Sequence, residues 1–320
     1  MLIATRTKVF FLPGDASSAD AELRIDADSI AAVAESDRCE VIALPGGRLR
    51  VLLDGRVREV ATGITDRIES MLILHSDPLE LLIGTEPPHV HLVEGDGPAR
   101  RVEAFDTLPC RDRWHTPWGG PPAVRSLAAT RDGWVYADIH VGSIMRSADR
   151  GRRWEPVTPE LHEDVHQVAT CPADDDRVYA NTANAVYVST DRGLSWLDRG
   201  QGLDHRYGRA IAAHPADPDC ILASVSDGPH GSTASSPPSG ENVHGGLYRT
   251  DNAGLEWRHV TEGFPASTVD NINTHHVAFS TGGLAWAAVA GTLYLSRDRG
   301  LSWDAFWVAP AVIEMIACGR

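Results

Sequence analysis

Ser189-Thr-Asp191-Arg-Gly193-Leu-Ser-Trp196 is the stretch that decides the fold, because three further copies of it recur in the second half of the chain. They are Ser147-Ala-Asp149-Arg-Gly151-Arg-Arg-Trp154, Thr250-Asp251-Asn-Ala-Gly254-Leu-Glu-Trp257, in which we expect an extra residue before the glycine, and Ser296-Arg-Asp298-Arg-Gly300-Leu-Ser-Trp303. Each copy follows a strand-like run. The aspartate can accept backbone hydrogen bonds, the glycine supplies a positive φ, and the tryptophan can pack beneath the loop. The pattern therefore predicts a hairpin turn.

These four copies resemble the Asp box, or BNR repeat, of sialidases, family 74 xyloglucanases, sortilin-type receptors and photosystem II assembly factors. The resemblance implies a β-propeller whose Asp boxes lie on the turns between the third and fourth strands of each blade. Those turns are on the face opposite to the one that usually carries the site. We therefore expect the box residues to be structural.

A second pattern, a polar residue followed by Leu, Ile or Val and small residues, recurs roughly every 40 residues, as expected for the inner strands of blades. Its copies begin at Ser29, Ser70, Arg125, His166, Arg209, His275 and Glu314. The chain ends soon after the last copy, and strand-like runs at 1–5, 8–12 and 21–25 can complete that blade. We predict an all-β, seven-bladed propeller of four-stranded antiparallel blades, closed by N-terminal and C-terminal strands in one blade, with six blades as the alternative. Residues 1–320 form one domain, with insertions at 107–123 and 227–246 on the top face.

The composition limits the classes of binding partner and indicates the cellular compartment. A formal charge of −15 argues against nucleic acid and anionic membranes, because phosphate binding needs a basic face. The five cysteines are scattered and form no Cys-x-x-Cys pair. The start of the chain has no signal-peptide pattern. We expect a cytoplasmic protein with free thiols.

The heads of the inner strands predict a polar pocket at the mouth of the central channel. Arg125, Arg209, Tyr207, Trp114 and Trp118 are the candidate substrate-binding residues. The candidate catalytic residues are His166, His275 and Glu314. The alternative is that channel-lining positions are polar only because the channel holds water.

Histidines are numerous, 14 in all, and most fall in segments expected on the top face. Neutral imidazole binds zinc, copper or iron and also moves protons near pH 7. No His-x-x-x-His helix motif occurs, so a site for a divalent transition metal would be assembled across blades from His166, His205, His244 and His275. The alternative is that the protein has no cofactor.

The two insertions are the expected specificity elements. The first carries Trp114 and Trp118, whose indoles either wall an organic ligand or plug the channel. The second is rich in Gly, Ser and Pro and is either a lid or a surface insertion.

Three function classes follow. The first is an enzyme whose His/Arg pocket acts on a small polar or anionic substrate, by metal-assisted hydrolysis or by elimination. The second is a non-catalytic binding or assembly propeller with a protein partner. The third is a sialidase-like glycosidase, which is disfavoured because the chain has no Arg-Ile-Pro motif. The family 74 glycosidases use a cleft between two propellers, and only one propeller is expected here.

Overall fold

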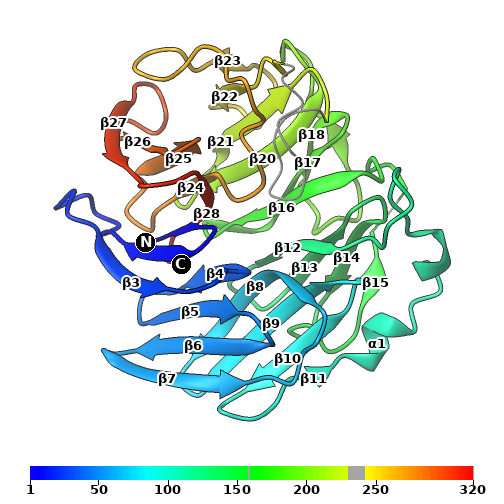
Figure 1. Ribbon diagram of the computed structural model, residues 1–320. Coiled ribbons are helices and arrows are strands. Elements are labelled where there is room, and N and C mark those ends of the chain that lie inside the picture. The colour runs from blue at the N-terminus through cyan, green and yellow to red at the C-terminus, as the bar shows by residue number, and fades with distance from the viewer. Residues whose placement is uncertain (158, 230–241, 320) are drawn as a thin grey trace.

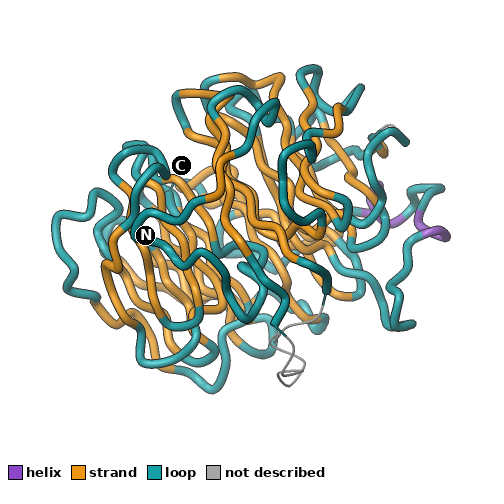
Figure 2. Tube along the Cα trace, turned by 90° about the horizontal axis from the view of Figure 1, so that it is seen from above, coloured by secondary structure: helices purple, strands orange, loops and turns teal. Residues whose placement is uncertain are grey.

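The computed structural model describes residues 1–157, 159–229 and 242–319, and it forms a closed ring of seven four-stranded sheets. In Figure 1 the inner strands surround the centre, and the outer strands form the rim. Figure 2, turned by 90°, shows strands running through the body and loops gathered at its two faces. The predicted seven-bladed propeller is confirmed.

The first four blades in chain order are antiparallel throughout. The closing blade contains β28 (Ile313–Ala317), β1 (Leu2–Thr5), β2 (Lys8–Phe11) and β3 (Glu22–Asp26). The next contains β4 (Ala32–Glu35), β5 (Cys39–Leu44), β6 (Arg48–Leu53) and β7 (Arg56–Ala61). Then come β8 (Arg67–Ser76), β9 (Leu79–Glu86), β10 (Val90–Glu94) and β11 (Arg100–Arg101). The fourth contains β12 (Val124–Ala129), β13 (Val135–Ile139), β14 (Ser143–Ser147) and β15 (Glu155–Pro156).

The last three blades repeat the same order. They are β16 (Val165–Cys171), β17 (Asp174–Thr182), β18 (Ala185–Ser189) and β19 (Leu197–Asp198); then β20 (Tyr207–His214), β21 (Asp217–Ser226), β22 (Gly246–Thr250) and β23 (Arg258–His259). The last is β24 (Val277–Phe279), β25 (Ala285–Val289), β26 (Thr292–Ser296) and β27 (Asp304–Val308). Within the first insertion lies the 3-10 turn η1 (Arg111–Arg113), and α1 (Glu103–Asp106) precedes it.

The ring closes through the two ends of the chain. Strand β28 pairs antiparallel with β1, with Leu2 opposite Ala317 and Ile3 opposite Ile316. Figure 1 shows the N and C labels side by side at this blade. This pairing gives β1 a partner on both sides and leaves no free inner edge, which stabilises the ring against edge-to-edge association. The predicted closure is confirmed.

The Asp box is a network of short-range hydrogen bonds at the turn from third to fourth strand. In the box of β18, the Ser189 hydroxyl donates to Asp191 at 2.8 Å and accepts from the Gly193 N–H at 2.7 Å. Asp191 also accepts from the Ser195 N–H at 2.8 Å. Two successive residues, Arg192 and Gly193, have positive φ. The glycine is required because a Cβ there would lie 3.0 Å from Val157.

One detail of the predicted boxes is wrong. The copy after β22 has no inserted residue: Asn252 occupies the aspartate position, accepting from the Thr250 hydroxyl at 2.8 Å and from the Glu256 N–H at 2.9 Å. Asp251 instead pairs with Arg249. An amide oxygen accepts the same bonds as a carboxylate, so the turn keeps its shape without the acid.

The box turns also tie neighbouring blades together. Arg146 on β14 donates to the Arg192 carbonyl of the next blade at 2.9 Å. Arg249 on β22 donates to the Arg299 carbonyl of its next blade at 2.6 Å. Both arginine side chains are buried. The hydrophobic clusters are likewise shared between adjacent blades, as where Trp196 packs with Val157. No helix among the described residues is long and apolar enough to cross a membrane.

Candidate functional site

Four neighbouring inner strands carry a β-bulge at the same place, close to their start. The register shifts between Ile68 and Ser70, Val124 and Ser126, Val165 and Gln167, and Gly208 and Ile211. A bulged residue leaves the ladder, and its side chain can be aimed in a new direction. The residues at these bulges include Glu69, Arg125, His166 and Arg209. The bulges explain how three of the predicted site residues leave their blades at equivalent positions.

The ring of strand heads needs one correction. Ser70, predicted to be equivalent to Arg125, is buried and donates its hydroxyl to the Val124 carbonyl at 2.8 Å. Glu69 holds the bulge instead, and its carboxylate pairs with Arg67 at 2.6 Å. Burial raises the pKa of Glu69, and Arg125 is among the charges that act on it. The bulge shifts the equivalence by one residue, which the sequence pattern did not reveal.

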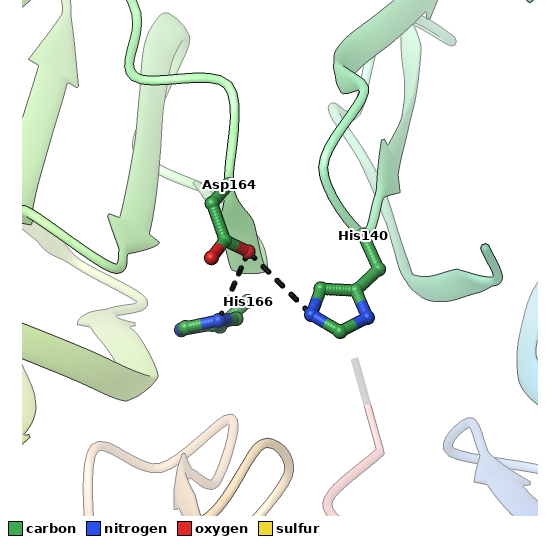
Figure 3. A group of neighbouring side chains, drawn as sticks. All are labelled: His140, Asp164 and His166. Atoms are coloured by element: carbon green, nitrogen blue, oxygen red, sulfur yellow. Dashed lines mark ion pairs between the residues drawn. The ribbon is translucent and has the colours of Figure 1, made fainter. Parts of the chain in front are cut away.

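At the centre of the top face, two histidines converge on one carboxylate (Figure 3). Asp164 lies just before β16, His166 on that strand, and His140 in the turn between β13 and β14. The Nε2 atoms of His166 and His140 lie 3.1 and 3.5 Å from the same Asp164 oxygen, Oδ1. That oxygen is buried and has no hydrogen-bond partner among the described residues. The three ligand-type atoms all lie within 4.8 Å of one another.

The orientation of His166 is fixed by its other nitrogen. Nδ1 lies 2.5 Å from the Gly208 carbonyl, which can only accept, so Nδ1 carries the proton. In the neutral ring Nε2 then has a lone pair, and this lone pair faces Asp164 and the Tyr207 hydroxyl, 3.4 Å away. His166 is fully buried. Burial, together with Arg209, lowers its pKa to about 4 despite the carboxylate.

Arg125 lowers the pKa of all three side chains in this group. Burial, Arg125 and His166 lower the pKa of His140 to about 2. Burial would raise the pKa of Asp164, but His166, His140 and Arg125 outweigh it and lower the pKa to about 2. Two neutral imidazoles therefore face one ionised carboxylate.

Arg125 and Arg209 stand beside this group without partners of their own. Neither guanidinium makes a hydrogen bond or ion pair with any described residue, and Arg125 Nη1 and Arg209 Nε are buried. The Arg209 residue is only 6% exposed, and its guanidinium carbon lies 5.0 Å from the centre of the Tyr207 ring. Burial lowers the pKa of Arg209 to about 10, so it remains charged at neutral pH. Unpaired buried cations are costly, and anions are the ligands that relieve that cost.

The two predicted indoles take different places. The Trp118 ring lies 4.8 Å from that of His140 and is 69% exposed, so Trp118 covers one side of the group. Trp114 is turned away and packs on Phe105 at 5.5 Å, with the Arg111 guanidinium 4.7 Å from its ring. The first insertion thus supplies one ring to the site and one to the core.

His275 lies in the floor beneath the group. Thr274 donates to the His166 carbonyl at 2.8 Å, the His275 N–H donates to Gln167 at 3.1 Å, and His275 Nε2 donates to the Arg125 carbonyl at 3.2 Å. The segment before β24 therefore spans the channel. Below it lies a cavity of about 1020 Å³, lined by Gln167, His275 and the far ends of the inner strands with the turns after them. This cavity is thus on the other side of the floor from Asp164.

The remaining predicted residues lie elsewhere. Glu314 is half-buried, and burial raises its pKa while Arg6 opposes the shift. His205 and His244 each place Nδ1 2.6 Å from a different oxygen of Asp227. Residues 230–241 of the second insertion lie outside the described residues. The potential ligand group among the described residues thus contains one predicted ligand, His166, and two residues not predicted as ligands, His140 and Asp164. The sequence signal that could have indicated Asp164 as a ligand is Asp164-Val-His166, in which two ligand-type residues alternate at the start of an inner strand.

Comparisons with known proteins agree with the repeats. Residues 142–244 match the sortilin/Vps10 family model, described as sortilin, neurotensin receptor 3. An oligoxyloglucan-reducing end-specific xyloglucanase of Emericella nidulans is 25% identical over 195 residues. That match covers 53% of this chain and 22% of the relative, so the chain spans about a fifth of the curated relative's length.

Solved structures share the fold at low identity. An ancestral family 74 enzyme aligns with a TM-score of 0.64 at 15% identity, over 87% of this chain and 38% of its own. YCF48 bound to D1 peptide aligns with 0.55 at 17% identity, over 86% and 81%. The WD40 propeller domain of Doa1 aligns with 0.58 at 13% identity, over 88% and 83%. The recognition of an Asp-box β-propeller is confirmed.

Proposed function

We propose that this propeller is an enzyme acting on a small anionic substrate, bound on the top face between Arg125, Arg209 and the His140–Asp164–His166 group. The observation that carries the proposal is that Arg125 and Arg209 make no hydrogen bond or ion pair with any described residue, and that one guanidinium atom of each is buried. A carboxylate or phosphate would accept two hydrogen bonds from each planar guanidinium. Trp118 would cover the organic part of the substrate, because its exposed ring already lies against His140.

The reaction classes that suit this group are hydrolysis and elimination. In hydrolysis, a water molecule attacks the electrophilic atom, a neutral imidazole takes its proton, and that proton leaves with the departing group. In elimination, the imidazole takes a proton from carbon as the leaving group departs from the neighbouring carbon. Of the predicted catalytic residues, His166 is the one we place at the reacting atoms; we place His275 in the floor that holds the Arg125 main chain.

A glycosidase is the weaker alternative, although the curated relative is a xyloglucanase. Glycoside hydrolysis needs two carboxyl groups on either side of the bond, roughly 5 to 10 Å apart. The only carboxylate in the group around His166 is Asp164, and it is held between two histidines. We also propose a cytoplasmic location, which rests on five cysteines that are all unpaired.

Calorimetric titration of the untagged protein tests the proposal. The probes are inorganic phosphate, sulfate, citrate and a neutral xyloglucan oligosaccharide. We expect one equivalent of an anion to bind, and Arg125→Met or Arg209→Met to weaken it roughly 10- to 100-fold, the range of charge-assisted hydrogen bonds. Arg297→Met, on the exposed Arg297, is the matched control. Anion binding that survives both variants, or binding and cleavage of the neutral oligosaccharide alone, would contradict the proposal.

A further inference from the structure

From the geometry of this group we infer a metal site, in which His140, Asp164 and His166 together hold one divalent transition-metal ion. The inference deepens the proposed function and rests on it for the anionic ligand that the ion would share. With the ion bound, His140 and His166 would serve as its ligands and not as proton acceptors. No described residue supplies the contact that the Asp164 oxygen lacks. The group is formed by two loops and one strand of two neighbouring blades, and its side chains point at one another (Figure 3).

The first argument is the placement of hydrogen-bond acceptors. The Gly208 carbonyl fixes the proton of His166 on Nδ1, so its Nε2 lone pair points at a carboxylate oxygen 3.1 Å away. Two acceptors at that distance repel each other unless a proton or a metal cation lies between them. A metal ion removes the conflict, since both atoms can bind it.

The second argument is distance. Ligand atoms about 2.0–2.1 Å from a tetrahedral ion lie about 3.3 Å from one another. The two observed separations from Asp164 Oδ1, 3.1 and 3.5 Å, bracket this value. Two imidazoles and one carboxylate suit zinc and related ions, and three protein ligands leave a position for water or substrate, as in catalytic sites.

The third argument is the support around the ligands. A metal-binding histidine usually donates its other N–H to a backbone carbonyl or a carboxylate, which fixes the tautomer and the ring orientation. The bond from His166 Nδ1 to the Gly208 carbonyl provides this support. Arg125 and Arg209 oppose a dication alone, so the ion and an anion should bind together and strengthen each other's affinity. The chemical class of ligand is therefore an anion that reaches both the ion and the arginines.

Metal binding by untagged protein, stripped with a chelator, tests the inference. Cobalt(II) is added and followed by its visible absorption, and zinc by calorimetry, each with and without inorganic phosphate. We expect one equivalent of metal, bound at least 10-fold more tightly when phosphate is present. His140→Gln and Asp164→Asn should each weaken metal binding at least 100-fold. The Asp164 side chain is 18% exposed and that of His140 is 8% exposed, whereas His166 is fully buried, so these two variants carry less risk of unfolding the protein, and their melting temperatures check that they fold. His205→Gln is the matched control.

The outcomes separate the two proposals. If the stripped wild-type protein binds no metal, or if metal binding is lost in His205→Gln and kept in the other two variants, the inference is overturned. If phosphate still binds in an Arg209-dependent way, the proposed function survives that result. If metal binds through His140 and Asp164 while phosphate and the other anions do not bind at all, the metal site stands and the proposed function fails.

Discussion

The Asp-box turns and the group of charged residues on the top face lie at opposite ends of the same blades, and the hydrogen bonding of their polar atoms differs. In the box of β18, the serine, the aspartate and the glycine N–H are all satisfied within a few residues. In the top-face group, Arg125, Arg209 and Asp164 each carry a buried atom without a hydrogen-bond partner among the described residues. Groups that satisfy one another locally specify the fold, whereas groups left unsatisfied after folding are available to a ligand. The following predictions test that contrast, from the largest expected effect to the smallest.

Trp196→Ala should cause the largest loss of stability. Its indole is 6% exposed and packs with Val157 and Tyr136 of the preceding blade. Truncating a buried aromatic side chain costs about 3 to 5 kcal/mol. Urea unfolding would measure the loss, and anion binding should persist below the transition. Trp118→Ala, which removes an exposed ring beside His140, should do the reverse and weaken binding without changing the unfolding midpoint. Equal effects of the two variants would remove the contrast.

Acid should destabilise the protein through His276, a satisfied buried group. Its Nε2 donates to the Glu314 carbonyl at 3.1 Å, and burial lowers its pKa from 6.5 to about 4. The unfolded chain therefore takes up a proton at higher pH than the folded chain does, and stability falls as pH drops from 6.5 towards 4. At about 1.4 kcal/mol per unit, this group contributes up to about 3 kcal/mol.

Unfolding free energies of His276→Gln between pH 7 and 4 should accordingly fall less steeply than those of the wild type. His115→Gln, at an exposed histidine, is the matched control. A His276→Gln protein with the wild-type slope would show that another group causes the acid sensitivity.

Asp191→Ala should cost about 1 to 3 kcal/mol, because it leaves the Ser189 hydroxyl and the Ser195 N–H without their acceptor. Anion binding should be unchanged. The matched variant Asn252→Asp converts the one amide-containing box to the acidic form. It should change stability by no more than about 0.5 kcal/mol, because the same oxygen accepts the same bonds. Loss of anion binding in Asp191→Ala with unchanged melting would mean that the box face is functional.

Arg209→Met should have a small effect on stability, between none and a gain of about 1 kcal/mol, although it weakens anion binding roughly 10- to 100-fold. The substitution removes a buried, unpaired cation and breaks no hydrogen bond to a described residue. What it loses is the contact with the Tyr207 ring. Thermal unfolding with and without phosphate checks this. A loss of more than about 2 kcal/mol would identify Arg209 as structural, and the contrast between the two faces would break down at this residue.

The repeats made most of the fold predictable, because each blade uses the same local solution. The Asp boxes, the inner strands and the closure by β28 and β1 follow from short-range patterns that recur. Errors arose where a residue left the pattern. Asn252 was misaligned because its neighbour is an aspartate, and Glu69 was missed because a bulge moves the equivalent position by one residue.

The site was only partly predictable for the same physical reason. His166, Arg125 and Arg209 could be named because they share a place in the repeat, and Trp118 because it lies in an insertion. Asp164 and His140 occupy loops that do not repeat, and nothing in their spacing shows that they meet. Conversely, the shared strand position suggested that His275 lines the same pocket, whereas the segment before β24 places it beneath His166.

By itself the sequence determined the blade architecture and the turn chemistry, because these depend on local periodicity. The tertiary structure alone decided which charges have no partner, which bulges turn side chains out of the ladder, and which histidines share a carboxylate. Those facts depend on contacts between blades: Asp164 meets His140 only because two consecutive blades stand side by side in the ring.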